Sequence, residues 1–245
     1  MDITLYYREK GNQEPFILLH GNGQDNSYFI HQIDYFSSRY RVIALDTRGH
    51  GKSPRGTEPF TMEQFSQDLY DFMTSHKLSN AVILGFSDGA NIAMKFAIHY
   101  PDKVKALILN GGNLDPNGVK RTTQIPIEFG YKIARHFAVK SPGAKKNAEM
   151  LGLMVNEPNM DRTELSKITA PTLVICGSND IIKDLTKNLI NGLKRSITII
   201  MPPNTRNALQ KTKLIIYTII LIGISGVIAW IMSCFKVLRI FTMNN

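Results

Sequence analysis

The chain has 245 residues and is 43% hydrophobic, which is enough for one large domain with a buried core and marginal for two. Its net charge of +9 does not indicate a nucleic-acid binder, because residues 1–184 are nearly neutral and the eight basic residues after Asp184 meet no acidic one. The two cysteines make no disulfide framework and the first ten residues are too polar for a secretory signal, so a reducing compartment is expected.

Short apolar runs alternate with longer amphipathic segments along the first 200 residues. Runs rich in Val, Ile and Leu, and amphipathic segments between them, predict an α/β fold with a doubly wound, mostly parallel sheet. The strands are expected near 3–8, 15–19, 41–45, 81–86, 105–110, 171–176 and 196–201, and the helices near 26–38, 61–76, 89–100 and 183–193.

The alternation breaks between residues 113 and 165. Helical patterns at 128–138 and 143–155 lie there without a convincing strand. We therefore expect residues 113–165 to be a small helical cap inserted into a core made of residues 1–112 and 166–201.

A second break begins near residue 202. The tail, residues 202–245, is first polar and basic, and Leu214–Phe235 then runs for 22 residues without a charge. A helix of that length would be about 33 Å long, enough to span a bilayer core of roughly 30 Å. The alternative is an unusually hydrophobic last helix packed on the sheet. The segment thus predicts a transmembrane helix at 214–235, and the basic excess before it favours a cytoplasmic catalytic body that is anchored to the membrane.

The motif Gly85-Phe86-Ser87-Asp88-Gly89 fits G-x-S-x-G. The pattern alone is weak, but an apolar strand (81–84) runs into it and a helix (90–99) leaves it, as a nucleophile elbow requires. The flanking glycines lack the Cβ atoms that would clash in so tight a turn. Ser87 is the candidate nucleophile, and the alternative is a glycine-rich turn that holds an ordinary serine.

His20-Gly21-Asn22-Gly23 follows the strand at 15–19. With this motif in the right order before the elbow, the sequence resembles the α/β-hydrolase family, in its bacterial serine esterase and lipase-like branch, over residues 1 to about 200. The resemblance implies that the backbone amides of Asn22 and Asp88 form the oxyanion hole. Two fixed N–H donors stabilise the charge that develops in acyl transfer.

Two further loops extend the resemblance. Asp46–Ser53 is similar to the family's D-x-R-G-x-G-x-S loop, whose role is mainly structural, so His50 is not the candidate base. Asp180, in Gly177-Ser178-Asn179-Asp180, matches the position that supplies the triad carboxylate, which would orient a histidine. The alternative for Asp180 is a solvated turn aspartate.

The catalytic histidine of the family is missing. It should follow the strand at 196–201, but residues 202–207 contain none and the last histidine of the chain is His136. Without an adjacent base, a serine hydroxyl is a weak nucleophile. Two explanations stay open for the tail: a translated alternative reading frame or truncated ending of a damaged hydrolase, and a C-terminal membrane anchor on a diverged scaffold.

These residues predict a serine hydrolase that acts on an ester or similar acyl bond through an acyl-enzyme, impaired by the missing histidine. The alternatives are a catalytically inactive relative that binds a small acyl ligand or a partner under its cap, and a membrane-tethered relative. The expected partner is a small acyl or ester substrate, with membrane contact through 214–235 and no nucleic acid. No metal site and no cofactor are expected, because no metal-ligand cluster or phosphate loop is visible and this chemistry needs neither.

Overall fold

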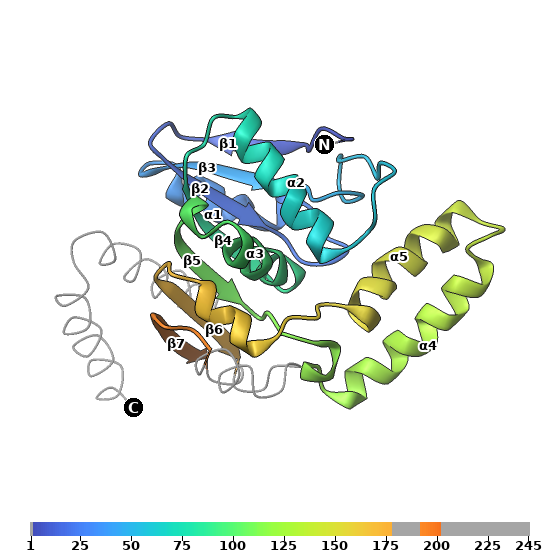
Figure 1. Ribbon diagram of the computed structural model, residues 1–245. Coiled ribbons are helices and arrows are strands. Elements are labelled where there is room, and N and C mark those ends of the chain that lie inside the picture. The colour runs from blue at the N-terminus through green and yellow to red at the C-terminus, as the bar shows by residue number, and fades with distance from the viewer. Residues whose placement is uncertain (1, 178–191, 202–245) are drawn as a thin grey trace, which may run out of the picture. The chain divides into compact units, whose positions relative to one another are not determined.

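The computed structural model describes residues 2–177 and 192–201 (Figure 1). Met1–Ile200 forms one compact unit, and Met201–Asn245 is a second unit that lies almost wholly outside the described residues. The strands are β1 (Tyr7–Lys10), β2 (Glu14–Leu19), β3 (Tyr40–Leu45), β4 (Ala81–Phe86), β5 (Val104–Asn110), β6 (Thr172–Gly177) and β7 (Ser196–Met201). The α-helices are α1 (Ile30–Phe36), α2 (Met62–Ser75), α3 (Asp88–His99), α4 (Arg121–Phe137) and α5 (Pro142–Asn156), with 3₁₀ turns η1 (Asn26–Phe29), η2 (Pro101–Lys103), η3 (Pro116–Gly118) and η4 (Arg162–Lys167).

The described strands form one seven-stranded sheet in the order β1-β3-β2-β4-β5-β6-β7. Strand β1 is antiparallel to β3, whereas β2 pairs in parallel with both β3 and β4, and β4, β5 and β6 continue in parallel. The predicted α/β class with a doubly wound, mostly parallel sheet is confirmed. Strand β4, which leads to the elbow, lies in the middle of the sheet.

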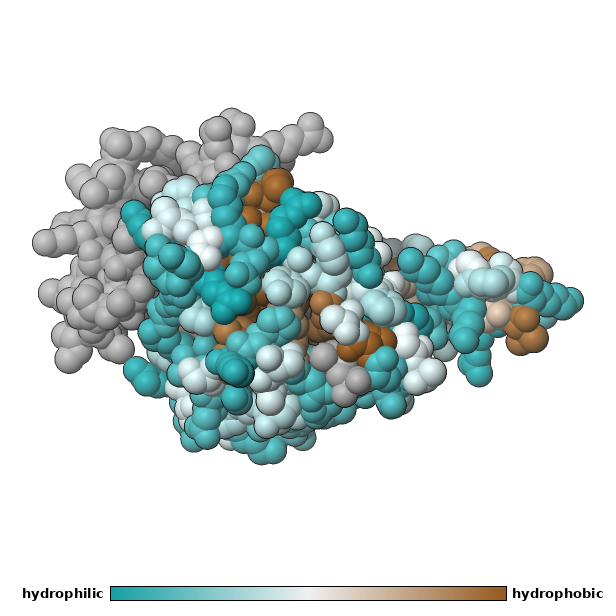
Figure 2. Space-filling model, turned by 90° about the horizontal axis from the view of Figure 1, so that it is seen from above, coloured by the Kyte–Doolittle hydropathy of each residue, from teal (hydrophilic) through white to brown (hydrophobic). Residues whose placement is uncertain are grey.

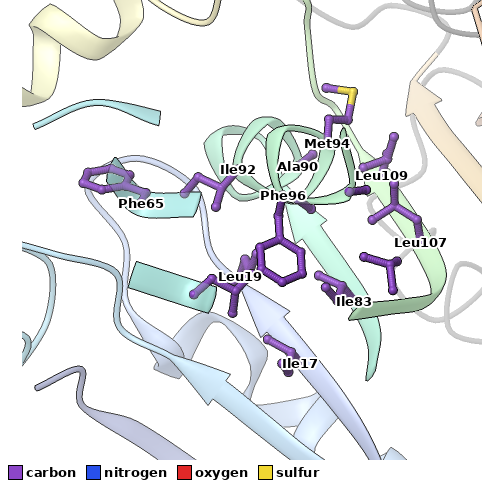
Figure 3. Packing of buried hydrophobic residues seen from close by; sticks show 14 of the residues in the cluster. Ile17, Leu19, Phe65, Ile83, Ala90, Ile92, Met94, Phe96, Leu107 and Leu109 are labelled. Carbon is purple, nitrogen blue, oxygen red and sulfur yellow. The ribbon is translucent and has the colours of Figure 1, made fainter. Parts of the chain in front are cut away.

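Helices cover both faces of this sheet, as the alternation of side chains along a strand requires. Ile17 and Leu19 of β2 pack on one face in the core cluster that contains Phe65 of α2 and Phe96 of α3 (Figure 3). Phe16, one residue along, points to the other face and meets Phe36 of α1 edge-on at 5.3 Å between ring centroids. Burial on both sides explains why β2 reads as a continuous apolar run.

The first strand begins later than the predicted 3–8. Ile3 and Leu5 are buried in the core, but the paired strand starts at Tyr7 and runs to Lys10. The apolar pattern correctly indicates that Ile3 and Leu5 are buried, but these residues are buried without being paired in a strand. Just before them, Asp2 accepts hydrogen bonds from the buried Arg48 guanidinium.

Helices α4 and α5 pack on each other within the predicted cap, and we call residues 121–156 the cap hairpin (Figure 1). Helix α4 begins at Arg121, earlier than the predicted 128, and continues through Pro126. The helix predicted at 183–193 falls largely outside the described residues, and so does the whole of the span predicted at 214–235. Within the described ranges, every helix is too short or too polar to cross a bilayer.

Candidate active site

Ser87 stands at the turn between β4 and α3, where the sequence predicts a nucleophile. Its backbone has a φ of 52° and a ψ of −119°, and a positive φ is uncommon for any residue except glycine. The Ser87 N–H donates to Asn110 O of β5 at 2.8 Å, and Ser87 O accepts from Ala90 N at 2.8 Å. Such strain costs about 1–3 kcal/mol and persists only where the surroundings hold it. The turn has the geometry of a nucleophile elbow.

The two glycines of the motif are required by close contacts of the backbone. A Cβ atom on Gly85 would collide with the carbonyl oxygen of Gly89, so β4 and α3 could not meet at this angle. A Cβ atom on Gly89 would collide with the carbonyl oxygen of Leu19, at the end of β2. The glycine spacing therefore allows the helix to start directly against the sheet.

The predicted oxyanion loop lies beside Ser87. A Cβ atom placed on Gly21 would be 3.2 Å from Ser87 Cβ. The Gly21 N–H donates to Gln24 Oε1 at 3.0 Å, which closes the loop on itself. Asp88 is the first residue of α3, so its amide has no acceptor within the helix. Asn22, in this loop, and Asp88, at the start of α3, are thus brought close to Ser87 from two separate segments.

The side chains of Asn22 and Asp88 also meet, which the sequence did not predict. The Asn22 amide group lies close enough to the Asp88 carboxylate to oppose the rise of its pKa, and it donates from Nδ2 to Met150 O of α5 at 2.7 Å. Asp88 Oδ2 is enclosed and has no hydrogen-bond partner within the described ranges. Burial, with a smaller contribution from the Glu157 carboxylate, raises the pKa of Asp88 to about 6. The sequence signal that could have suggested this contact is the carboxylate of Asp88, at the position between the serine and the second glycine of G-x-S-x-G.

His20 braces the oxyanion loop and does not face Ser87. Thr47 N–H donates to His20 Nε2 at 3.0 Å, so that nitrogen carries the lone pair and Nδ1–H donates to Gly21 O at 2.8 Å. Burial lowers the pKa of His20, which keeps the ring neutral in this arrangement. The imidazole therefore fixes the position of the loop that holds Asn22.

The loop after β3 is held by charge-assisted bonds. Asp46 is fully buried, and its carboxylate accepts from Asn26 N at 2.7 Å and from Lys52 N at 2.8 Å. The Arg48 guanidinium is also fully buried and donates to Asp68 at 2.7 and 2.6 Å. These bonds make the loop a structural support, which agrees with the role that the resemblance implies.

His50 is buried in the same loop. Its Nδ1 lies 3.0 Å from the carbonyl oxygen of Arg48, which can only accept, so Nδ1 carries the proton. Nε2 has no hydrogen-bond partner among the residues described. Burial, together with the neighbouring His20, lowers the pKa of His50 to about 4, so the ring is neutral near pH 7.

No described histidine is hydrogen-bonded to Ser87. His76 bonds Phe72 O at the end of α2, and His99 lies 3.1 Å from Glu63. His136 is exposed in the last turn of α4, with its ring against Phe137. Asp180, the predicted carboxylate, lies outside the described residues, as do residues 202–207. The predicted nucleophile, Ser87, and the predicted oxyanion loop therefore lie side by side, while the acid–base residues also stay a prediction.

A cavity of about 640 Å³ lies between the cap hairpin and the loops that flank the elbow. Its polar wall includes Gln24, Asp25 and His50, and its apolar wall comes from cap residues Ile133, Phe137, Met150 and Leu151. Ser87 is not among its lining residues. Within the described ranges, no group of three or more His, Cys, Asp or Glu residues is arranged to hold a metal ion.

Three polar ties join the cap hairpin and the segment after it to the core. Arg55 makes two parallel bonds to Glu149, at 3.0 and 2.9 Å. The Asn22–Met150 bond is the second tie, and Met62 N donates to Glu157 Oε2 at 2.7 Å as the third. Sequence patterns do not reveal these pairs, because their partners are about 95 or more positions apart.

Comparisons with known proteins agree with this geometry. Residues 14–132 match the family model described as "alpha/beta hydrolase fold". The AB hydrolase superfamily protein YisY of Bacillus subtilis is 26% identical over 228 residues, which cover 79% of this chain and 85% of that protein. The (E)-2-((N-methylformamido)methylene)succinate hydrolase of Acinetobacter baylyi is 34% identical over 109 residues, which cover 44% of this chain and 41% of that enzyme.

Among solved structures, an esterase from Exiguobacterium antarcticum superposes with a TM-score of 0.72 at 21% identity, covering 88% of this chain and 95% of that one. That likeness concerns the fold. For several of its curated relatives, the chain spans less than half of the relative's length. The sheet order, the elbow and the family match over residues 14–132 show that the chain has the α/β-hydrolase fold.

Proposed function

We propose that the protein is a serine hydrolase that cleaves an ester or similar acyl bond of a small substrate. The observation that carries the proposal is the positive φ of Ser87 at the strand-to-helix turn, beside the loop of Asn22. A strained backbone at that point is costly and serves to expose a side chain at the edge of the sheet.

In this proposal, the Ser87 hydroxyl attacks the carbonyl carbon and forms an acyl-enzyme that water then hydrolyses. The backbone N–H groups of Asn22 and Asp88 stabilise the oxyanion. Asp180 would orient a base, and the chain supplies no histidine after His136 for that role. The base is the missing component, and its absence typically lowers the rate by several orders of magnitude.

A fluorophosphonate probe tests the nucleophile directly, since it reacts covalently with activated serines. We expect wild-type protein to be labelled and Ser87→Ala not to be. Ser75→Ala, at the end of α2, is the matched control and should keep wild-type labelling. Equal labelling of wild type and Ser87→Ala would remove Ser87 from the proposal.

A second candidate is a catalytically inactive relative that binds a small acyl ligand under the cap hairpin. The observation in its favour is that the buried histidines next to the elbow, His20 and His50, each donate to a backbone carbonyl. This candidate predicts a folded protein with negligible turnover of short p-nitrophenyl esters. Introducing a histidine within residues 202–207, for example Asn204→His, separates the two: recovered turnover means that the rest of the site is intact.

The membrane anchor at 214–235 is a separate proposal, which rests on the apolar sequence alone. Fractionation of cells that express the full chain tests it. The anchor requires the protein to need detergent for extraction, and protein that remains in the aqueous fraction would rule it out.

A further inference from the structure

The side of helix α4 that is turned away from α5 carries a stripe of exposed apolar residues. Ile125, Phe129, Ile133 and Phe137 recur every four residues and are 53%, 66%, 46% and 50% exposed. Val139, just after the helix, is 93% exposed. Large apolar side chains in such a row are normally buried against another element, and a continuous exposed patch marks an interaction surface. We call these five residues the α4 stripe.

The stripe is not the side of α4 that packs on α5. Gln124 is buried and donates to Met154 O of α5 at 3.1 Å, and Tyr131 lies against Gly152 of α5. At about 100° per residue, Phe129 is about 140° around the helix from Gln124 and about 160° from Tyr131. The hairpin therefore leaves the apolar side of α4 uncovered, while only the stripe residues Ile133 and Phe137 also reach the cavity.

The stripe lies in strongly basic surroundings. Residues 120–146 contain seven basic residues and one acidic residue, Glu128, which pairs with Arg121. Lys132 lies about 60° around the helix from Phe129, at one edge of the stripe, and Lys140, Lys145 and Lys146 lie in or near the turn between the helices. Figure 2 shows hydrophobic residues among hydrophilic ones on the projecting hairpin, at the right of the view. An apolar row with a basic border is the footprint of a helix that lies on an anionic membrane surface.

The positive charge around the stripe favours one of the partners that could cover it. A second copy would bring an equally basic hairpin against this one, and like charges would repel. The eight basic residues after Asp184 are not complementary to the basic border either, and a stripe covered by the apolar segment 214–235 would show short-wavelength emission that vesicles leave unchanged. An anionic lipid headgroup layer supplies both the opposite charge and an apolar interior for Phe129 and Ile125.

We propose that the α4 stripe and its basic border dock the cap hairpin on the surface of a bilayer that contains anionic lipid. The contact is peripheral, and it is distinct from the span predicted at 214–235. The phenylalanine and isoleucine side chains enter the headgroup–acyl boundary, and the lysine and arginine groups bind phosphates above it. The docking does not depend on whether Ser87 is active.

The test must report on the cap hairpin and not on the tail, so a single tryptophan is placed in the stripe of the full chain. The chain's one tryptophan, Trp230, is replaced in the variant Phe129→Trp/Trp230→Phe, which we call the stripe probe. Ile30→Trp/Trp230→Phe, which places the indole at a partly exposed apolar position on α1, is the matched control probe. Both are mixed with vesicles of phosphatidylcholine alone, or of phosphatidylcholine with phosphatidylserine, with and without brominated acyl chains.

We expect the tryptophan emission of the stripe probe to shift to shorter wavelength and to be quenched by brominated chains only when phosphatidylserine is present, while the control probe changes little. Adding Lys132→Glu and Lys140→Glu to the stripe probe should raise the vesicle concentration needed for half of the shift at least about tenfold. Unchanged emission from the stripe probe, or equal shifts with both kinds of vesicle, overturns the proposal. A shift without vesicles that grows with protein concentration identifies a second copy instead, and a shift on adding acidic polypeptide but not vesicles identifies a protein partner.

Discussion

The loops around Ser87, residues 20–25 and 46–53, differ from the cap hairpin in how they are held. The loops bury Asp46 and Arg48 completely and satisfy them with several charge-assisted bonds. The hairpin buries few side chains of its own, is tied to the core by a few polar contacts and exposes the α4 stripe. The loops next to Ser87 are thus held by many internal bonds, whereas the cap hairpin depends on few contacts and can differ more freely in sequence.

Removing Arg48 should have the largest effect on stability, because it breaks the more rigid of the two regions. Arg48→Ala leaves the buried Asp68 carboxylate without its guanidinium, and we expect the free energy of unfolding to fall by about 3–5 kcal/mol. Arg41→Ala, which breaks a surface pair with Glu9, should cost under about 1 kcal/mol. Urea unfolding measures both, and similar losses for the two variants would contradict the contrast.

Gly89→Ala should cause the second largest loss of stability. The added Cβ meets the Leu19 carbonyl, a backbone atom that cannot move aside cheaply, so we expect a loss of about 2–3 kcal/mol and weaker labelling of Ser87. Gly143→Ala in the cap hairpin is the matched change, since the atom nearest to its Cβ, Ser141 Oγ, would be 3.8 Å away at an exposed position. That variant should be neutral or gain up to about 1 kcal/mol. Thermal unfolding distinguishes them.

Asp88→Asn should stabilise the protein at high pH. The pKa of this carboxyl is raised from 3.8 to about 6 in the folded state, so folding binds a proton between these values and stability falls as the pH rises through that window. We expect Asp88→Asn to raise the free energy of unfolding at pH 8 by about 1–2 kcal/mol and by less at pH 4. Asp102→Asn, on the surface, is the control. A gain that is the same at both pH values would show that charge burial is not its cause.

Arg55→Ala should have the smallest effect on global stability, because its bonds to Glu149 are partly exposed. We expect a loss under about 1 kcal/mol, together with faster amide hydrogen exchange along α5, since one of its ties to the core is gone. Glu149→Gln keeps the shape and should give a smaller change in exchange. If the amide hydrogen exchange of α5 is unchanged in Arg55→Ala, the other two ties are sufficient to hold α5 on the core.

The contrast between the loops around Ser87 and the cap hairpin also explains which features could be predicted from the sequence. Strand β2 and the G-x-S-x-G turn carry local signals, apolar runs and obligatory glycines, so their positions were predictable. The contact of Asn22 with Asp88 and Met150 joins three distant segments, and no local pattern encodes such a contact. The start of β1 differed from the predicted one because Ile3 and Leu5 are buried without strand pairing. Asp180 and the anchor at 214–235 stay predictions.

The tie from Asn22 to the cap ends on a main-chain carbonyl, that of Met150. Every amino acid presents the same carbonyl, so residue 150 can be exchanged without losing the acceptor, provided the helix is kept. The side chain at position 150, which lines the cavity, can therefore change over evolution while the hydrogen bond from Asn22 to the cap hairpin is kept. The shape of the cavity and the position of the cap hairpin relative to the loop of Asn22 become separately adjustable in this arrangement.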